Sequence, residues 1–361
     1  MANNHIDIPA VPALPVAPAT YSPSWGASTL NVLRLYFNLL TNALRQLSSP
    51  YGGRFLNFPS GSFFDTTDQH DGSTTIPYAM RLNSTSYSNG VTVEDRTAVV
   101  TASIGPASTT LTCTAVTSGR FYPGMLLSGT GVTAGTYIYL QLSSTATALT
   151  GPYTFVSGGG AGTNTVVLNS VTGLEERQFV SGTGVPANTR ITAVDTGTNT
   201  ITLSANFTVQ AAGTYTIRPW GYEGTYSVSP SQTVASTTIT GVSSSKITVA
   251  YDGIYNVQFS AQFANTDTQL HDVDVWFKKN DVTIDESNTS VSITSKHGGV
   301  DGHMCLTVNL FVELLAGEYV EIVWHTNDSA VYIEYISAGT SPVRPAAPSV
   351  IATVAFVSAL P

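Results

Sequence analysis

The clearest pattern along the chain is a strict alternation of apolar and polar residues in its last third. In the segment GIYNVQFSAQF, every second position is apolar: Tyr255, Val257, Phe259, Ala261 and Phe263. The same period of two recurs in residues 273–277, 306–314 and 350–356. A period of two is typical of a strand with one buried face. The pattern predicts an antiparallel β-sandwich.

A helical period marks residues 29–47. Apolar residues recur there at spacings of three and four, as in the a/d seam of a coiled coil: Leu30, Leu33, Phe37, Leu40, Leu44 and Leu47. Ser28 is the expected N-cap, and a Ser, Pro and Gly-rich segment ends the helix, so residues 28–53 form one unit. Two interpretations follow. The helix packs on its own domain, or helices of several copies meet on an axis, which we favour.

The residues before this helix, 1–27, are rich in proline. One proline occurs at every third position: Pro9, Pro12, Pro15 and Pro18. Polyproline II has three residues per turn, so the four rings line one edge of an extended arm. This arm is either a disordered tail or a peptide that binds in a groove of another protein.

The middle of the chain has its own character. Residues 97–222 contain only seven charged residues and an internal repeat, SGTGVTAGTYI at 128–138 and SGTGVPANTRI at 181–191. We expect two small β modules in tandem, joined by a linker at 158–162. The SGTG motif has no following lysine and no helix behind it, so it predicts a hairpin turn and not a phosphate loop.

Composition excludes several classes of function. Of 361 residues, 14 are basic and 23 acidic, and Ser and Thr together number 89. The net charge of −9 argues against nucleic-acid binding. No apolar run is long enough for membrane insertion, and the start of the chain does not look like a secretory signal, so we expect folding in the cytoplasm. Cys113 and Cys305 lie too far apart in sequence to suggest a disulfide framework.

Three groups of polar residues are candidates for chemistry. Two could ligate a divalent cation, namely Asp65, Asp68, His70 and Asp71, and His271, Asp272 and Asp274. The segment between His297 and His303 is glycine-rich and has no paired nucleophile. For glycan cleavage, which requires two facing carboxylates, the insert offers only Glu175, Glu176 and Asp195. We expect no catalytic residue, no metal and no cofactor.

The order of motifs resembles the complement-type globular head of the tumour-necrosis-factor-like jelly-roll superfamily. The matching segments are GIYNVQF from Gly253, Trp276 to Asn280, and Gly317-Glu318, with FFDTTDQHD and PYAMRLNSTSYSNGVTV as the early strands. The resemblance implies one jelly roll in two halves, 54–96 and 241–361, with residues 97–240 inserted. It also implies a homotrimer. The calcium-binding residues of some heads have no match here.

The arrangement of arm, helix, GGRFLNFPSGSFFDTT and jelly-roll motifs also resembles structural proteins of tailed bacteriophages. This resemblance implies a non-enzymatic virion protein, a homotrimeric fibre that is tail-associated and used in host attachment. Its arm would bind a tail adaptor or capsid protein, and its loops a host surface glycan. The alternatives are a capsid head fibre or cement (decoration) protein, a tail-spike polysaccharide depolymerase and a bacterial surface adhesin.

Overall fold

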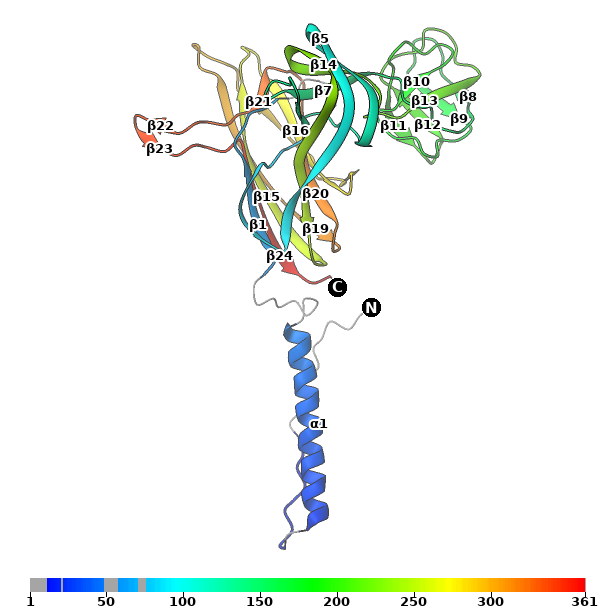
Figure 1. Ribbon diagram of the computed structural model, residues 1–361. Helices are drawn as coiled ribbons and strands as arrows, with labels where there is room; N and C mark the ends of the chain where they lie inside the picture. The colour runs from blue at the N-terminus through cyan, green and yellow to red at the C-terminus, as the bar shows by residue number, and fades with distance from the viewer. Residues whose placement is uncertain (1–11, 21, 49–57, 71–75, 361) are drawn as a thin grey trace.

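The computed structural model describes residues 12–20, 22–48, 58–70 and 76–360. The predicted fold class is confirmed, because the chain is mainly β, with several antiparallel sheets and one helix near the N-terminus. Figure 1 shows the β-structure gathered at one end of the molecule and the helix at the other. Three separate hydrophobic cores hold the β-structure together.

The predicted sandwich contains the first core. Its first sheet is formed by β1 (Ser60–Asp65), β2 (Gln69–His70), β4 (Ser84–Asn89), β15 (Gly253–Asn265), β19 (Gly302–Leu314), β21 (Val331–Ile333) and β24 (Val350–Ser358). Its second sheet is formed by β3 (Tyr78–Ala79), β16 (His271–Lys279), β17 (Val282–Thr283), β18 (Thr289–Ile293) and β20 (Tyr319–Thr326), with one end each of β5 and β14. The alternating apolar side of β15 is buried between the two sheets, as its pattern predicts.

Two very long strands connect the sandwich to the rest of the β-structure. β5 (Val91–Gly119) and β14 (Gly224–Val249) pair antiparallel along almost their whole length. Val91 and Ile247 lie in the sandwich core, whereas Ala98 and Ile239 lie in the second core. The last of the expected early strands, which ends at VTV, is therefore longer than expected, because β5 continues past its charged residues into the next unit. The expected boundary at residues 96–97 lies between these two cores.

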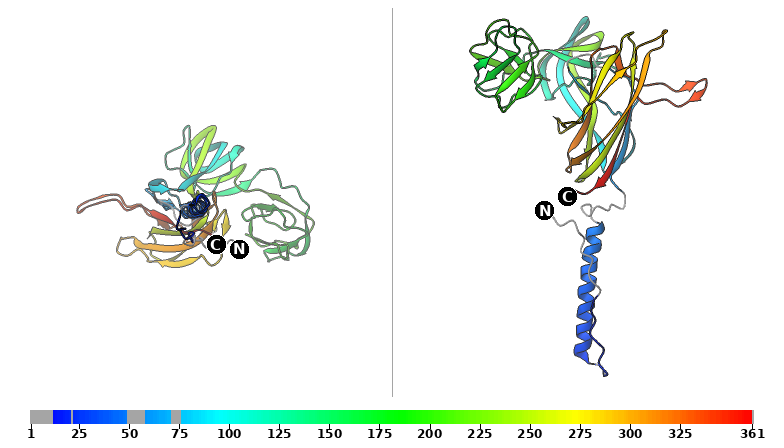
Figure 2. Two further views of the ribbon diagram at one scale, coloured as in Figure 1. Left: turned by 90° about the horizontal axis from the view of Figure 1, so that it is seen from below. Right: turned by 180° about the vertical axis from the view of Figure 1, so that it is seen from behind.

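The second core is closed by β6 (Leu126–Gly129) and β7 (Tyr137–Ser144), which pair with β14. The third core lies in a separate small barrel, at the right of Figure 1 and again apart from the sandwich in Figure 2. Its strands are β8 (Tyr153–Gly158), β9 (Thr165–Leu168), β10 (Phe179–Ser181), β11 (Ile191–Asp195), β12 (Thr200–Leu203) and β13 (Thr214–Arg218). A bridge between Phe179 and Arg190 joins the two edge strands and closes the sheet.

The expectation of tandem modules is wrong, because the barrel is nested inside the second unit. β6 and β7 find their partner in β14, which follows the barrel in sequence. The expected linker at 158–162 is also corrected. It is the loop of the β8–β9 hairpin within the barrel, where the Gly159 N–H donates to the Thr165 carbonyl at 2.8 Å.

The two repeats do form the same turn, which confirms the hairpin prediction. Gly131 and Gly184, at equivalent positions, have φ of 82° and 80°. The next equivalent pair, Gly135 and Asn188, has φ of 81° and 60°. These left-handed conformations favour Gly and Asn, which explains why the repeat keeps such residues there.

The helix α1 (Pro23–Ser48) begins earlier than predicted. The Ser22 hydroxyl accepts a hydrogen bond from the Trp25 N–H at 3.2 Å and is the N-cap, so Ser28 lies inside the helix. Pro23 occupies the first helical position, where its missing N–H is not needed. The helix ends close to the predicted Leu47, and residues 49–53 lie outside the described part.

The arm folds back along α1 instead of extending from it. Residues 12–20 run beside the helix in Figure 1, and the Trp25 indole donates to the Pro15 carbonyl at 3.1 Å. Pro12 and Pro15 are half-buried, whereas Pro18 is exposed and Pro9 lies outside the described residues. A hairpin of β22 (Gly339–Thr340) and β23 (Val343–Arg344) also projects from the sandwich.

Candidate functional site

The first expected metal group is a structural network and not a cation site. Asp65 is buried, and its carboxylate accepts a hydrogen bond from the Gln69 amide at 2.7 Å and lies 4.0 Å from Arg81. Burial raises the pKa of Asp65 despite the nearby Arg81. The His70 ring stacks on Tyr332 at 4.9 Å. Asp71 lies outside the described residues, so its part in the group stays a prediction.

The second expected group is divided by its strand. Asp272 accepts a hydrogen bond from Ser292, and Asp274 accepts one from Asn288, both on the polar side of β16. His271 instead lies with Asp267 and Asp328, whose donor atoms all lie within 4.8 Å of one another.

The donor atoms of this trio already have hydrogen-bond partners. His271 Nε2 is 2.8 Å from Asp267 Oδ2, and Asp328 Oδ1 accepts the Ala330 N–H at 2.8 Å. The pKa of Asp267 is lowered, chiefly by the hydrogen bond with His271. Of the two histidines that flank the glycine-rich segment, His303 lies 3.2 Å from Glu334, and His297 forms a turn with Val300.

A cavity of about 280 Å³ lies where the sandwich, the second unit and the barrel meet. The sandwich contributes residues of β3, β16 and β20, and the inserted units contribute residues around Arg120, Glu175 and Trp220. Both faces of β20 are buried here, since the outward-facing Glu321 and Val323 are only 2% and 4% exposed. The inserted units therefore cover the outer face of the second sheet at this point.

The cavity wall is highly charged. Its basic residues are Arg96, Arg120, Arg177 and Lys278. Its acidic residues are Glu175, Glu176, Asp281 and Glu321. A charged group that is removed from water requires a partner or a ligand, so the pairing of these eight side chains decides what the cavity can do.

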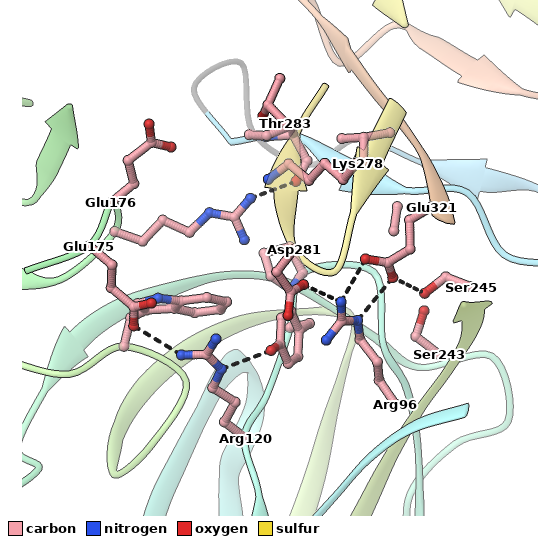
Figure 3. A pocket seen from close by; sticks show the side chains of 17 residues that line it. Arg96, Arg120, Glu175, Glu176, Ser243, Ser245, Lys278, Asp281, Thr283 and Glu321 are labelled. Carbon is pink, nitrogen blue, oxygen red and sulfur yellow. Dashed lines mark hydrogen bonds and ion pairs between the residues drawn. The ribbon is translucent and has the colours of Figure 1, made fainter. Parts of the chain in front are cut away.

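Arg96 is the centre of one paired cluster. Figure 3 shows its guanidinium between Asp281 and Glu321. Its Nε and one terminal nitrogen donate to the two oxygens of Glu321 at 2.9 and 2.6 Å, a bidentate geometry. Burial disfavours the charge of Arg96, but the hydrogen bonds to Glu321 outweigh burial and raise its pKa. Ser245 donates a further hydrogen bond to Glu321 at 2.7 Å.

Arg120 is the centre of the second cluster. It donates to Glu175 at 3.0 Å and to the Tyr122 hydroxyl at 2.8 Å. Its guanidinium also lies over the ring of Trp220, 4.4 Å from the centroid. The arginine thereby joins the barrel to the second unit through both its charge and its planar face.

The other two cations are not paired in this way. Arg177 lies 4.9 Å from the centroid of Trp220 and donates to the Pro77 carbonyl at 3.2 Å. Burial lowers the pKa of Arg177. Burial also lowers the pKa of Lys278, and repulsion by Arg177 adds to this effect. Within the described part of the chain, neither cation forms an ion pair.

Sequence reasoning missed this cavity, because its residues are spread from Arg96 to Glu321 and form no motif. One signal was present. Of the seven charged residues in the segment 97–222, four line the cavity: Arg120, Glu175, Glu176 and Arg177. The sequence suggested only a catalytic role for Glu175 and Glu176. The third candidate, Asp195, lies outside the cavity wall and accepts hydrogen bonds from its own hairpin turn.

The expected trimerisation residues all lie on α1, and several are exposed in the single chain. Leu30, Phe37 and Leu44 are 64%, 57% and 55% exposed, whereas Leu33 and Leu40 are half-buried. The side chain of Leu47 lies outside the description. Among the described residues, no helix is both long and apolar enough to cross a membrane.

Comparisons with known proteins place few limits on this chain. No protein-family model matches the sequence, and no curated protein matches it. Among solved structures, the chain is similar to the tumour necrosis factor Eiger of S. frugiperda, with a TM-score of 0.22 and 14% identity. That similarity covers 32% of this chain and 67% of the other, and is too weak to carry an argument about function.

Proposed function

We propose that this protein is a non-enzymatic, homotrimeric structural component of a bacteriophage particle, a surface fibre on the tail that takes part in host attachment. The observation that carries the proposal is the exposed apolar surface of α1. Leu30, Leu35 and Phe37 are 64%, 62% and 57% exposed on a helix that lies apart from the β-structure. Large apolar side chains grouped on one element indicate an interaction surface.

A second copy of the chain is the partner that best fits this surface. Leu30 and Phe37 lie seven residues apart, so they repeat on one side of the helix at the spacing of a coiled-coil seam. The seam is too short to hold helices together alone. The β-domains of the three copies would add to the assembly, and the barrels would lie at the end remote from the helices.

The double variant Leu30→Asp/Phe37→Asp tests the assembly, because it places charge in the seam. We expect native mass spectrometry to show a trimer of the 38.0 kDa chain for the wild type and monomers for this variant. The matched control is Asn31→Asp/Asn38→Asp, which adds the same charge at exposed neighbouring positions and leaves the trimer intact. A monomeric wild type contradicts the proposal.

The location on the particle needs its own test. Gold-labelled antibody against the β-domains, applied to intact particles of the phage that encodes the protein, is expected to bind along the tail. Label on the capsid favours a head fibre or decoration protein instead. Particles without label contradict a virion role of either kind.

A further inference from the structure

The cavity at the junction of the three units has four basic and four acidic residues, but its ion pairs do not use them one to one. Arg96 is paired with Glu321 and Asp281, and Arg120 with Glu175. This pairing leaves two cations, Arg177 and Lys278, and one acid, the exposed Glu176. In the described part of the chain, the Lys278 ammonium has no hydrogen-bond or ion-pair partner, and the Arg177 guanidinium donates only to the Pro77 carbonyl.

These two cations are half-buried in the same cavity wall. Burial lowers the pKa of both, and repulsion by Arg177 lowers the pKa of Lys278 further. Such an arrangement costs free energy in the empty protein, and an anion placed between the two cations would offset that cost. Unpaired cations in a cleft are therefore typical of an anion-binding site.

The rest of the wall fits a ligand that has hydroxyl groups. The Ser243 side chain is 4% exposed and makes no hydrogen bond among the described residues. The Glu176 carboxylate and the Thr283 hydroxyl offer further polar atoms at the opening. The volume of about 280 Å³ exceeds what a bare oxyanion fills and is close to the lower limit for small-molecule sites.

We propose that this cavity binds one residue of an acidic sugar, with Arg177 and Lys278 holding its anionic group and Ser243 and Glu176 its hydroxyls. The anionic group is a carboxylate, a sulfate or a phosphate, since both side chains bind all three by charge-assisted hydrogen bonds. The inference goes beyond the proposed function, because the site lies within a single chain and does not depend on trimer formation or on the particle.

Isothermal titration calorimetry of the full chain tests the site. The ligands are glucuronate, glucose 6-sulfate and glucose 6-phosphate, with glucose and inorganic sulfate as controls. We expect at least one acidic sugar to bind, glucose not to bind, and inorganic sulfate to bind at least about tenfold more weakly than that sugar. The acidic sugar that binds most tightly identifies the anionic group.

The variant Lys278→Gln is expected to weaken the binding of that sugar by about tenfold or more. The matched control is Lys279→Gln, on the same strand but outside the cavity wall, which leaves affinity unchanged. If Lys278→Gln does not fold, Arg177→Gln is the second test variant, and it is also expected to lower the affinity for the sugar. The proposal is overturned if no acidic sugar binds, if inorganic sulfate binds as tightly as the best of them, or if the variants at 278 and 279 behave alike.

Discussion

The two sheets of the sandwich share one core, but their outer faces differ. On the second sheet, the outward-facing Glu321 and Val323 of β20 are 2% and 4% exposed beneath the inserted units. On the first sheet, Phe311 of β19 and Ile351 of β24 point outward and are 59% and 37% exposed. The insertion therefore covers one face of the sandwich and leaves the opposite face open.

The open face is uncharged on three of its strands. The outward positions of β1, β15 and β24 carry no charged residue and are formed by Ser60, Ser62, Phe64, Ile254, Asn256, Gln258, Ser260, Gln262, Ile351, Thr353, Ala355 and Val357. The cavity on the covered face instead contains the buried pair of Arg96 and Glu321 and the more exposed pair of Arg120 and Glu175, which joins the second unit to the barrel. Charged side chains thus pair with each other on the covered face, whereas the proposed trimer would pack on the open face.

The largest effect is expected from Arg96→Ala. This variant leaves the Glu321 carboxylate, whose side chain is 3% exposed, buried without its arginine. Removing one partner of a buried ion pair typically destabilises by about 3–5 kcal/mol. We expect a loss of that size in the free energy of unfolding, measured by urea denaturation.

The matched control lies on the open face. Gln258→Ala removes an exposed polar side chain of β15 and is expected to change stability by less than about 0.5 kcal/mol. Equal losses for the two variants would contradict the contrast between the covered face and the open face.

The contrast also explains how far the sequence predicted the structure. The alternation in β15 is visible because one side of the strand faces water, and its burial is confirmed. In β20, the segment from Val320 to Trp324 is buried on both sides, since the inserted units cover it. The sequence there contains a glutamate that looks like a solvated residue. Its partner, Arg96, lies 225 positions away, and no local pattern connects the two.

The sequence also gave no sign that the barrel is nested inside the second unit. The two repeats at 128–138 and 181–191 form equivalent turns, so they were expected to lie in tandem units. Which strand completes each unit depends on long-range pairing, and β14 follows both repeats.

The start of α1 was missed for a local reason. Pro23 was counted with the proline-rich arm, although proline is well suited to the first position of a helix.

A second, smaller effect is expected from Phe311→Asp on the open face. If this face packs against another copy, the variant removes about 1.5–3 kcal/mol of apolar burial from the interface and adds a charge to it. We expect a higher concentration for half-dissociation of the trimer, measured by analytical ultracentrifugation, with the fold unchanged by circular dichroism. Asn309→Asp adds the same charge two residues away on the same strand. This control separates the loss of the apolar contact from charge repulsion. If Phe311→Asp leaves the dissociation of the trimer unchanged, the interface between copies lies elsewhere.

The smallest effect concerns Lys278 on the covered face and is a dependence on pH. Because the pKa of Lys278 is lowered in the folded protein, the unfolded chain binds the proton more tightly between the folded pKa and the unfolded value of about 10.4. The contribution of Lys278 to stability is therefore unfavourable below its folded pKa and improves as pH rises through this interval. Lys278→Gln removes that unfavourable contribution. We expect the variant to unfold at a slightly higher temperature than the wild type at pH 7 and the difference to shrink toward pH 10. If the variant instead unfolds at a lower temperature than the wild type at pH 7, and this deficit disappears as pH rises, Lys278 has an anionic partner in the cavity.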